Sequence, residues 1–185
     1  MESMAPLRIG ALADRAETGE REARNVLDFE SMAKFDDIDR QLLTLLQDDD
    51  RLALSELSKK VGIPASTVND RIKRLTRQGM IAGFHARIAP EALGLNLLAF
   101  ILVSWSNPKV EAAFLKKAKA SPDVLECHHI TGAWNYLLKV RVKTTGELER
   151  FLSETVKGVD GVERTETLIA LSSAKETWKV SIPAT

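Results

Sequence analysis

The stretch GIPASTVNDRIKRLTRQGMI (residues 62–81) combines a helical apolar pattern with several basic side chains. Val68, Ile72 and Leu75 recur at the spacing of one face of an α-helix. Gly79 follows the last of them, and glycine is favoured just beyond the end of a helix. The pattern therefore predicts an amphipathic helix whose opposite face is polar.

Charge is balanced over the whole chain but not along it. Lysine plus arginine and aspartate plus glutamate each number 26, whereas residues 59–77 hold six bases and one acid. Six aspartates come earlier, between residues 36 and 50. An anionic partner responds to the local charge rather than to the net charge. The basic segment is therefore a candidate contact for nucleic acid.

Two further helices are predicted upstream of this segment. Residues 38–46 carry an apolar stripe at helical spacing, and Asp36 or Asp37 is suited to cap its start. A second helix over residues 54–61 ends before Gly62, a good residue for the left-handed turn that closes a helix. Two short helices joined by such a turn are typical of a helix-turn-helix.

The helix-turn-helix, over about residues 54–73, predicts that its second helix lies in the major groove of DNA. Small polar residues occupy the first turns, where such a helix meets base edges, and basic residues follow, where it passes phosphates. Asn69 is able to pair with adenine, and Asp70 is able to accept from N4 of cytosine. A solvated helix face is the alternative interpretation. The residues expected to face DNA are Ser66, Thr67, Asn69, Asp70, Arg71, Lys73, Arg74 and Arg77.

After residue 80 the apolar period changes from helical to alternating. Phe84, Ala86 and Ile88 alternate with polar residues and predict a short strand closed by Pro90. The order of the following elements, βαββαβ, predicts a ferredoxin-like antiparallel sheet with both helices on one face. We expect strands over residues 97–104, 124–131, 136–142 and 162–171, and helices over residues 110–120 and 146–156.

Two segments resemble the Lrp/AsnC family of leucine- and asparagine-responsive transcription regulators. They are FDDIDRQLLTLLQDDDRLALSELSKKVGIPASTVNDRIKRLTRQGMIAGFHARIAPEALG (residues 35–94) and ECHHITGAWNYLLKVRV (residues 126–142). The resemblance covers about residues 35–175 and implies an α+β chain with a winged helix-turn-helix before an αβ effector domain. It also implies dimers that assemble further, often to octamers.

The expected organisation follows from this resemblance. A stretch that starts at Met32 resembles a complete family N-terminus, so we expect residues 1–31 to be dispensable, flexible or untranslated. The parts are an N-terminal extension (1–34), a winged helix-turn-helix domain (35–89), a hinge (90–96), an αβ effector-binding and oligomerisation domain (97–175) and a C-terminal tail (176–185).

The chain departs from the family at two helix starts. Family members often have serine before the second helix, where this chain has Ala53, and serine then proline before the third, where it has Pro64 and Ala65. A missing N-cap costs about 0.5–2 kcal/mol. Ser66 is a substitute cap, which would shorten the first turn of the third helix.

The predicted effector loop also departs from the family, whose loops run Gly-Asp-aromatic-Asp. Here the run is GAWN, so both acids are absent. Asn135 is able to accept from an ammonium group, although a charge-assisted bond is roughly twice as strong. Three possibilities stay open: an amino acid held by backbone groups, a ligand without an ammonium group, or no ligand; without the resemblance, residues 132–135 are an ordinary hairpin turn. The resemblance implies effector contacts at His129, Gly132, Ala133, Trp134, Asn135, Thr145, Leu168, Ile169 and Ala170.

Metal and membrane functions find little support in the sequence. Cys127 and His129 share one face of a strand while His128 faces away, and no spaced Cys or His pair lies elsewhere, so we expect no metal site. A single cysteine suits the reducing cytoplasm. No run of about 18 apolar residues predicts a membrane span.

We therefore expect a cytoplasmic transcription regulator that binds double-stranded DNA and copies of itself. A small-molecule effector, an amino acid or a derivative of one, is its expected ligand, and no cofactor is expected. An architectural DNA-binding protein without an effector is the alternative, motivated by the absent loop acids. A small enzyme is a further alternative, but no nucleophile, acid–base pair or phosphate loop is visible.

Overall fold

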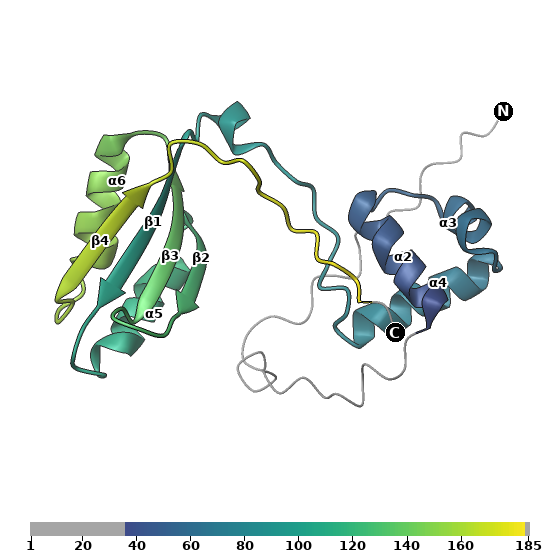
Figure 1. Ribbon diagram of the computed structural model, residues 1–185, viewed down its shortest axis with the longest axis horizontal. Helices are drawn as coiled ribbons and strands as arrows, with labels where there is room; N and C mark the ends of the chain where they lie inside the picture. Colours follow the sequence, from purple (N-terminus) through teal and green to yellow (C-terminus); the bar gives the residue numbers. More distant parts are fainter. Residues whose placement is uncertain (1–35, 184–185) are drawn as a thin grey trace. The chain divides into compact units, whose positions relative to one another are not determined.

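The computed structural model describes residues 36–183, which fall into two compact units (Figure 1). The helical unit consists of the described residues up to 86 together with residues 177–183, and the sheet unit is Arg87–Glu176. The expectations for residues 1–34 lie outside the described residues. Over residues 36–183, no helix is both long enough and apolar enough to cross a membrane.

Three helices pack around a small apolar core in the helical unit. Leu42, Leu57 and Val68, one from each helix, are buried together, and apolar side chains from the same helices surround them. Each core residue belongs to the apolar stripe of its helix, so the helical spacing of the sequence directly determines this packing. The helices are α2 (Asp37–Asp48), α3 (Leu54–Val61) and α4 (Ala65–Arg77).

The three helices differ in how their N-termini are capped. Asp36 caps α2 in a capping box, whereas Ala53 offers no side-chain cap to α3. The Glu56 side chain accepts from the Ala53 N–H at 3.2 Å. Pro64 precedes α4 and presets an extended backbone, with φ at −55°. The expectation that Ser66 caps α4 is wrong, because Ser66 lies inside the first turn.

The strand expected around residues 84–88 is not formed. This segment has no regular secondary structure, and no described segment forms a hydrogen-bonded ladder with it. Alternation of apolar residues specifies which faces a strand would present, and it does not supply a neighbouring strand. A 3₁₀ helix, η2 (Pro90–Leu93), follows and ends at Gly94, whose φ of 76° favours glycine.

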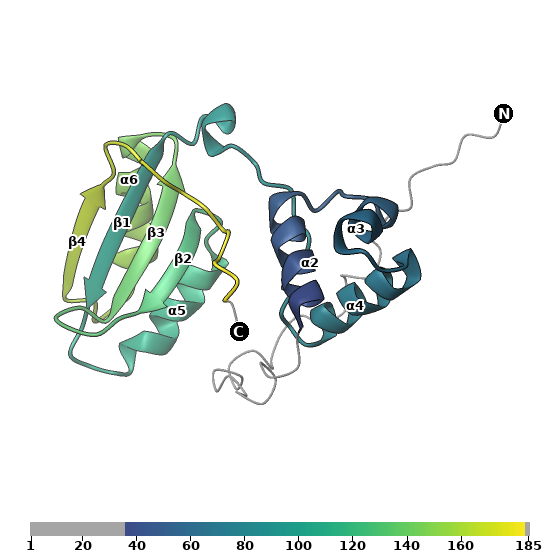
Figure 2. The same cartoon turned by 45° about the vertical axis from the view of Figure 1, so that its right-hand side comes forward.

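The sheet unit contains a four-stranded antiparallel sheet in the order β2-β3-β1-β4. Its helices cover one face of the sheet (Figure 2). The two edge strands, β2 and β4, end earlier than predicted, because an edge strand has only one neighbour to continue its ladder. The elements are β1 (Leu97–Ser104), α5 (Val110–Ala120), β2 (Val124–His129), β3 (Tyr136–Val142), α6 (Thr145–Phe151), a π-helical turn η3 (Leu152–Val156) and β4 (Arg164–Ile169).

Successive residues of β1 divide between two faces of the sheet. Ala99, Ile101 and Val103 are fully buried in the core beneath the helices. Phe100 and Leu102 alternate with them and therefore point away from the helices, where they are only half-buried. We call this helix-free side the outer face of the sheet.

A buried arginine ties the η2 turn and the end of the sheet unit to β3. The side chain of Arg141 is 6% exposed and pairs with Glu91 at 2.8 Å and with Glu176 at 2.5 Å. Lys139 adds a contact with Glu176 at 3.1 Å. The partners are 35 to 50 residues from Arg141 along the chain, so no local sequence pattern indicates this cluster.

The last described residues return to the helical unit and pair with α2. Gln47 accepts from the backbone N–H of Val180 at 2.8 Å and donates to its carbonyl at 3.2 Å. Lys179 pairs with Asp48 at 2.7 Å. The side-chain amide of Gln47 thus bonds both backbone groups of Val180, as a neighbouring strand would. This pairing fixes residues 179–180 at the end of α2.

Candidate DNA interface and effector site

The outward face of α4 is polar and accessible. Ser66, Thr67 and Asp70 are exposed in the first two turns, as are Lys73 and Arg77 further along the helix. Asn69 lies at the edge of this face and is half-buried. The helix therefore presents hydrogen-bonding groups first and positive charge later, which is the order that major-groove contact requires.

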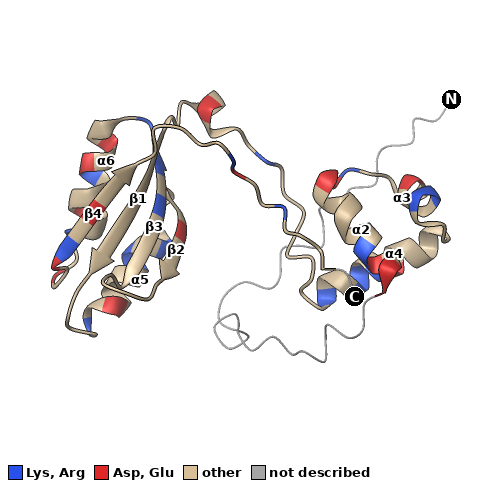
Figure 3. Ribbon diagram, in the orientation of Figure 1, with Lys and Arg blue, Asp and Glu red and all other residues tan. Residues whose placement is uncertain are grey.

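The four basic residues of α4 divide into two pairs. Figure 3 shows basic residues on α4 and acidic residues at the first turn of α2. Lys73 and Arg77 have no ion-pair partner within residues 36–183. Arg71 and Arg74, by contrast, both form ion pairs with the start of α2.

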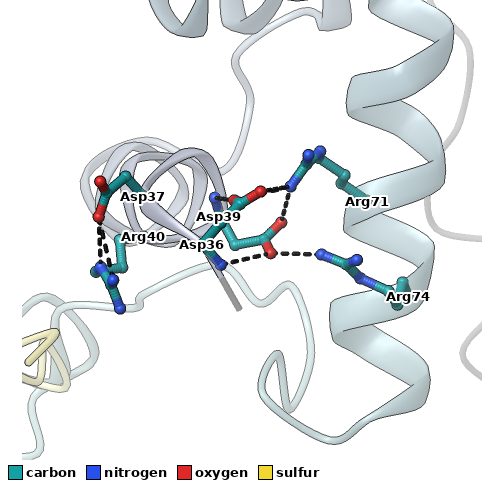
Figure 4. A network of polar contacts seen from close by, with 6 residues as sticks. All are labelled: Asp36, Asp37, Asp39, Arg40, Arg71 and Arg74. Carbon is teal, nitrogen blue, oxygen red and sulfur yellow. Dashed lines mark hydrogen bonds and ion pairs between the residues drawn. The ribbon is translucent and has the colours of Figure 1, made fainter. Parts of the chain in front are cut away.

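The network between α2 and α4 centres on Asp39 (Figure 4). Its carboxylate is fully buried; Arg71 donates to one oxygen at 2.9 Å, and Arg74 donates to the other. Asp36 accepts a second bond from Arg71 at 2.8 Å. The carboxylates of Asp36 and Asp39 raise the pKa of Arg71 above its ordinary value. Four charges thus neutralise one another between the two helices.

The Asp36 carboxylate makes the stability of the helical unit depend on pH. Burial raises the pKa of Asp36, but the Asp39 N–H and the Arg71 guanidinium outweigh this and hold the pKa below its ordinary value of 3.8. Such a group contributes stability above its unfolded pKa and loses it as pH falls through the folded pKa. In circular dichroism melts, we expect the gap in melting temperature between the wild type and Asp36→Asn to narrow below about pH 4. A gap that stays constant down to about pH 2 would contradict this.

Asn135 fixes the turn between β2 and β3 rather than standing free. Its side-chain oxygen accepts from the backbone N–H of Trp105 at 2.8 Å, and its backbone N–H donates to the carbonyl of Val103 at 2.9 Å. Its carbonyl accepts from Ile130 at 3.0 Å. The side-chain oxygen that is able to accept from an ammonium group therefore already accepts one hydrogen bond, and its second lone pair and the NH₂ group remain to contact a ligand.

Aromatic side chains surround this turn. Arg164 lies 4.8 Å from the centre of the Trp134 ring, a cation–π contact. His129 stacks on Tyr136 with ring centroids 4.9 Å apart. Burial, and then the Glu111 carboxylate that accepts from its hydroxyl, raise the pKa of Tyr136. Tyr136 is therefore a neutral hydrogen-bond donor near neutral pH.

The sheet register places the first group of effector residues at one end of the sheet. Tyr136 pairs with His129 on one side and with Val103 on the other, and the turn of residues 132–135 precedes it directly. We call His129 and residues 132–135 the loop-end group.

The remaining effector residues lie at the opposite end of the sheet. Ile169 pairs with Ala99 near the start of β1, and Thr145 follows the end of β3, where Val142 pairs with Leu97. We call Thr145 and residues 168–170 the far-end group. The six residue steps of β3 separate the two ends by about 20 Å.

A groove of about 510 Å³ in the sheet unit does not bring the two groups together. Arg87, Arg141 and Lys175 lie in its wall, and among the effector residues only Ala170 borders it.

Cys127 is half-buried, and burial raises the pKa of its thiol. Residues 36–183 contain no group of three or more His, Cys, Asp or Glu side chains arranged to hold a metal ion.

Comparison with known protein families assigns both parts of the chain. Residues 35–82 match a winged helix-turn-helix DNA-binding domain. Residues 98–180 match the Lrp/AsnC ligand binding domain. The first match includes α2, α3 and α4, and the second includes nearly the whole sheet and both groups of effector residues.

Individual relatives agree with these matches over most of the chain. The HTH-type transcriptional regulator FL11 of Pyrococcus furiosus is 40% identical over 147 residues, which are 80% of this chain and 96% of the relative. The leucine-responsive regulatory protein of Klebsiella pneumoniae is 34% identical over 80% of this chain and 91% of the relative. The structure of the regulator NMB0573 of Neisseria meningitidis in complex with L-Met has a TM-score of 0.76 at 29% identity, covering 80% of this chain and 96% of the other.

Proposed function

Since the chain belongs to the Lrp/AsnC family of DNA-binding transcription regulators, we propose that α4 is its sequence-recognising element. Ser66, Thr67, Asn69 and Asp70 contact base edges in the major groove, and Lys73 and Arg77 contact phosphates. The accessible order of these groups along α4 supports the assignment. We propose a cytoplasmic location, because the protein has to reach the chromosomal DNA that it binds.

We further propose that a free amino acid or a close derivative binds at the loop-end group. The NH₂ group of Asn135 donates to the ligand carboxylate, while its side-chain oxygen accepts from the backbone N–H of Trp105 and so fixes the orientation of the amide. Trp134 and His129 add aromatic surface beside it. The L-Met bound to the NMB0573 structure supports a ligand of this class.

The distance between the two groups within one sheet supports a ligand site that is shared between two copies of the chain. A small ligand cannot bridge about 20 Å, so one copy of the chain offers either the loop-end group or the far-end group to a given ligand. A complete site therefore needs the loop-end group of one copy and the far-end group of another. Ligand binding then favours one assembly over others, because a ligand stabilises the state that contains its site.

Dimerisation through the outer face of the sheet provides the two-fold unit. Phe100, Leu102 and Leu168 lie on this face and are half-buried or exposed. Apolar side chains gathered on an accessible sheet face favour burial against a partner. A second copy supplies a matching face, as two-fold interfaces require.

Trp134→Ala is expected to weaken the response to ligand while leaving the fold intact. We expect some L-amino acids, with L-Met tested first, to raise the melting temperature of the wild type, since ligands that bind only the native state stabilise it. Thermal shift and multi-angle light scattering should show that shift, and a ligand-dependent change in mass, reduced in Trp134→Ala. Trp178→Ala is the matched control, because Trp178 lies in the helical unit and is 73% exposed. An equal response in both variants would exclude the loop-end group as the site.

A further inference from the structure

The basic residues of α4 serve two different purposes, which their sequence spacing does not reveal. Arg71 and Arg74 lie three residues apart and both point to α2, as Figure 4 shows. Lys73 and Arg77 lie four residues apart and are exposed. Residues at these spacings share a helix face, so α4 presents one basic pair to the protein and the other to solvent.

Both oxygens of the Asp39 carboxylate accept hydrogen bonds. One carboxylate oxygen accepts from Arg71; the other accepts from Arg74 and, at 3.2 Å, from the backbone N–H of Asp36. Asp36 in turn accepts from the Asp39 N–H at 3.0 Å. The same two carboxylates therefore cap α2 and hold α4 against it, so the start of one helix fixes the position of the other.

The ion pairs also change what the arginines offer to DNA. A basic side chain contributes to the salt dependence of DNA binding when its charge replaces counterions at a phosphate. Arg71 and Arg74 already face carboxylates, and their side chains are only 22% and 38% exposed. Their positive charge is therefore compensated within the protein before DNA arrives.

We propose that Asp39 is a positioning residue that sets the recognition helix and withdraws Arg71 and Arg74 from phosphate contact. This inference rests on the proposed role of α4 in DNA binding. Only Lys73 and Arg77 then supply the counterion-releasing charge of this helix. Asp39 acts through the two arginines and makes no contact with DNA itself.

Two methionine substitutions on α4 separate positioning from phosphate contact. Arg77→Met should lower the slope of log K against log salt by about 0.9 for each phosphate that is no longer neutralised, and it should leave the melting temperature unchanged. Arg74→Met should leave that slope unchanged and lower the melting temperature of the helical unit by about 10 °C or more, because it leaves the buried Asp39 charge with one partner fewer. Salt titrations by fluorescence anisotropy and circular dichroism melts measure the two effects.

The outcomes distinguish this inference from the proposed function. If Arg74→Met lowers the slope as much as Arg77→Met and melts like the wild type, Arg74 contacts phosphate and the inference is overturned. If neither Arg77→Met nor Lys73→Met changes the slope, the proposed DNA face itself is wrong.

Asp39→Asn provides a second test in case the Arg74→Met variant does not fold. The amide has the shape of the carboxylate without its charge, so Arg74 is released toward solvent. We expect a lower melting temperature with a slope that is steeper by up to about 0.9 for the released Arg74, while Arg71 keeps its contact with Asp36. A residue that only stabilised the fold would weaken binding without making it more sensitive to salt. An equal or shallower slope in Asp39→Asn would therefore overturn the inference.

Discussion

Replacing Lys73 and Arg77 together by methionine is expected to weaken binding of duplex DNA by about three to four orders of magnitude near 0.1 M salt. In a two-fold complex the change removes two basic residues from each of two recognition helices. Each phosphate contact releases about 0.9 counterion, which is worth about one order of magnitude at that salt concentration. Fluorescence anisotropy over a range of salt concentrations measures both the affinity and the slope.

The fold of this double variant should be unaffected. Lys73 and Arg77 are exposed and have no ion-pair partner among the described residues, and methionine is a good helix former. The control is Lys59→Met together with Lys60→Met, which removes the same charge from exposed positions at the end of α3. Equal reductions in affinity for the two double variants would mean that general charge, and not the face of α4, determines binding.

Phe100→Glu is expected to convert the protein to a monomer and to lower its affinity for a two-half-site DNA by about 10²–10⁴-fold. A charge placed on the outer face of the sheet opposes burial of that face in a dimer. A monomer binds each half-site separately and loses the effective concentration that links the two sites. Binding to a single half-site should change little, because α4 lies in the other unit.

Sedimentation velocity together with DNA-binding assays tests this prediction. Ala113→Glu is the matched control, because it adds the same charge at an exposed position of α5. A dimeric Phe100→Glu protein with normal affinity would show that the outer face is not the dimer interface. A monomeric protein with normal affinity for two half-sites would show that this binding does not require dimerisation.

The elements that the sequence predicts well are those with a long, regular apolar period. The three helices of the helical unit and the order of the βαββαβ unit follow from such periods, and α3 has the expected bounds. The strand around Phe84 fails for a physical reason: alternation indicates an extended segment but not a partner. Ser66 fails as a cap because α4 already begins at Ala65, directly after Pro64.

The residues of the candidate site also divide into those that local sequence predicts and those that it does not. The exposed face of α4 is predictable from a helical wheel, because its residues are local in sequence. The partners of Arg71 and Arg74 are 32 to 35 residues away, so spacing alone groups all four bases together. The engaged oxygen of Asn135 depends on Trp105, 30 residues earlier. The separation of the two effector groups depends on the strand order β2-β3-β1-β4.

A hydroxyl-radical footprint on DNA that the protein itself selects from a random pool is the most direct test of sequence-specific recognition through α4. We expect two short protected half-sites about 34–36 Å apart, or a multiple of that spacing. We also expect the pattern to disappear when Lys73 and Arg77 are both replaced by methionine. Uniform protection without a preferred sequence, or a footprint unchanged in the double variant, would contradict recognition through α4.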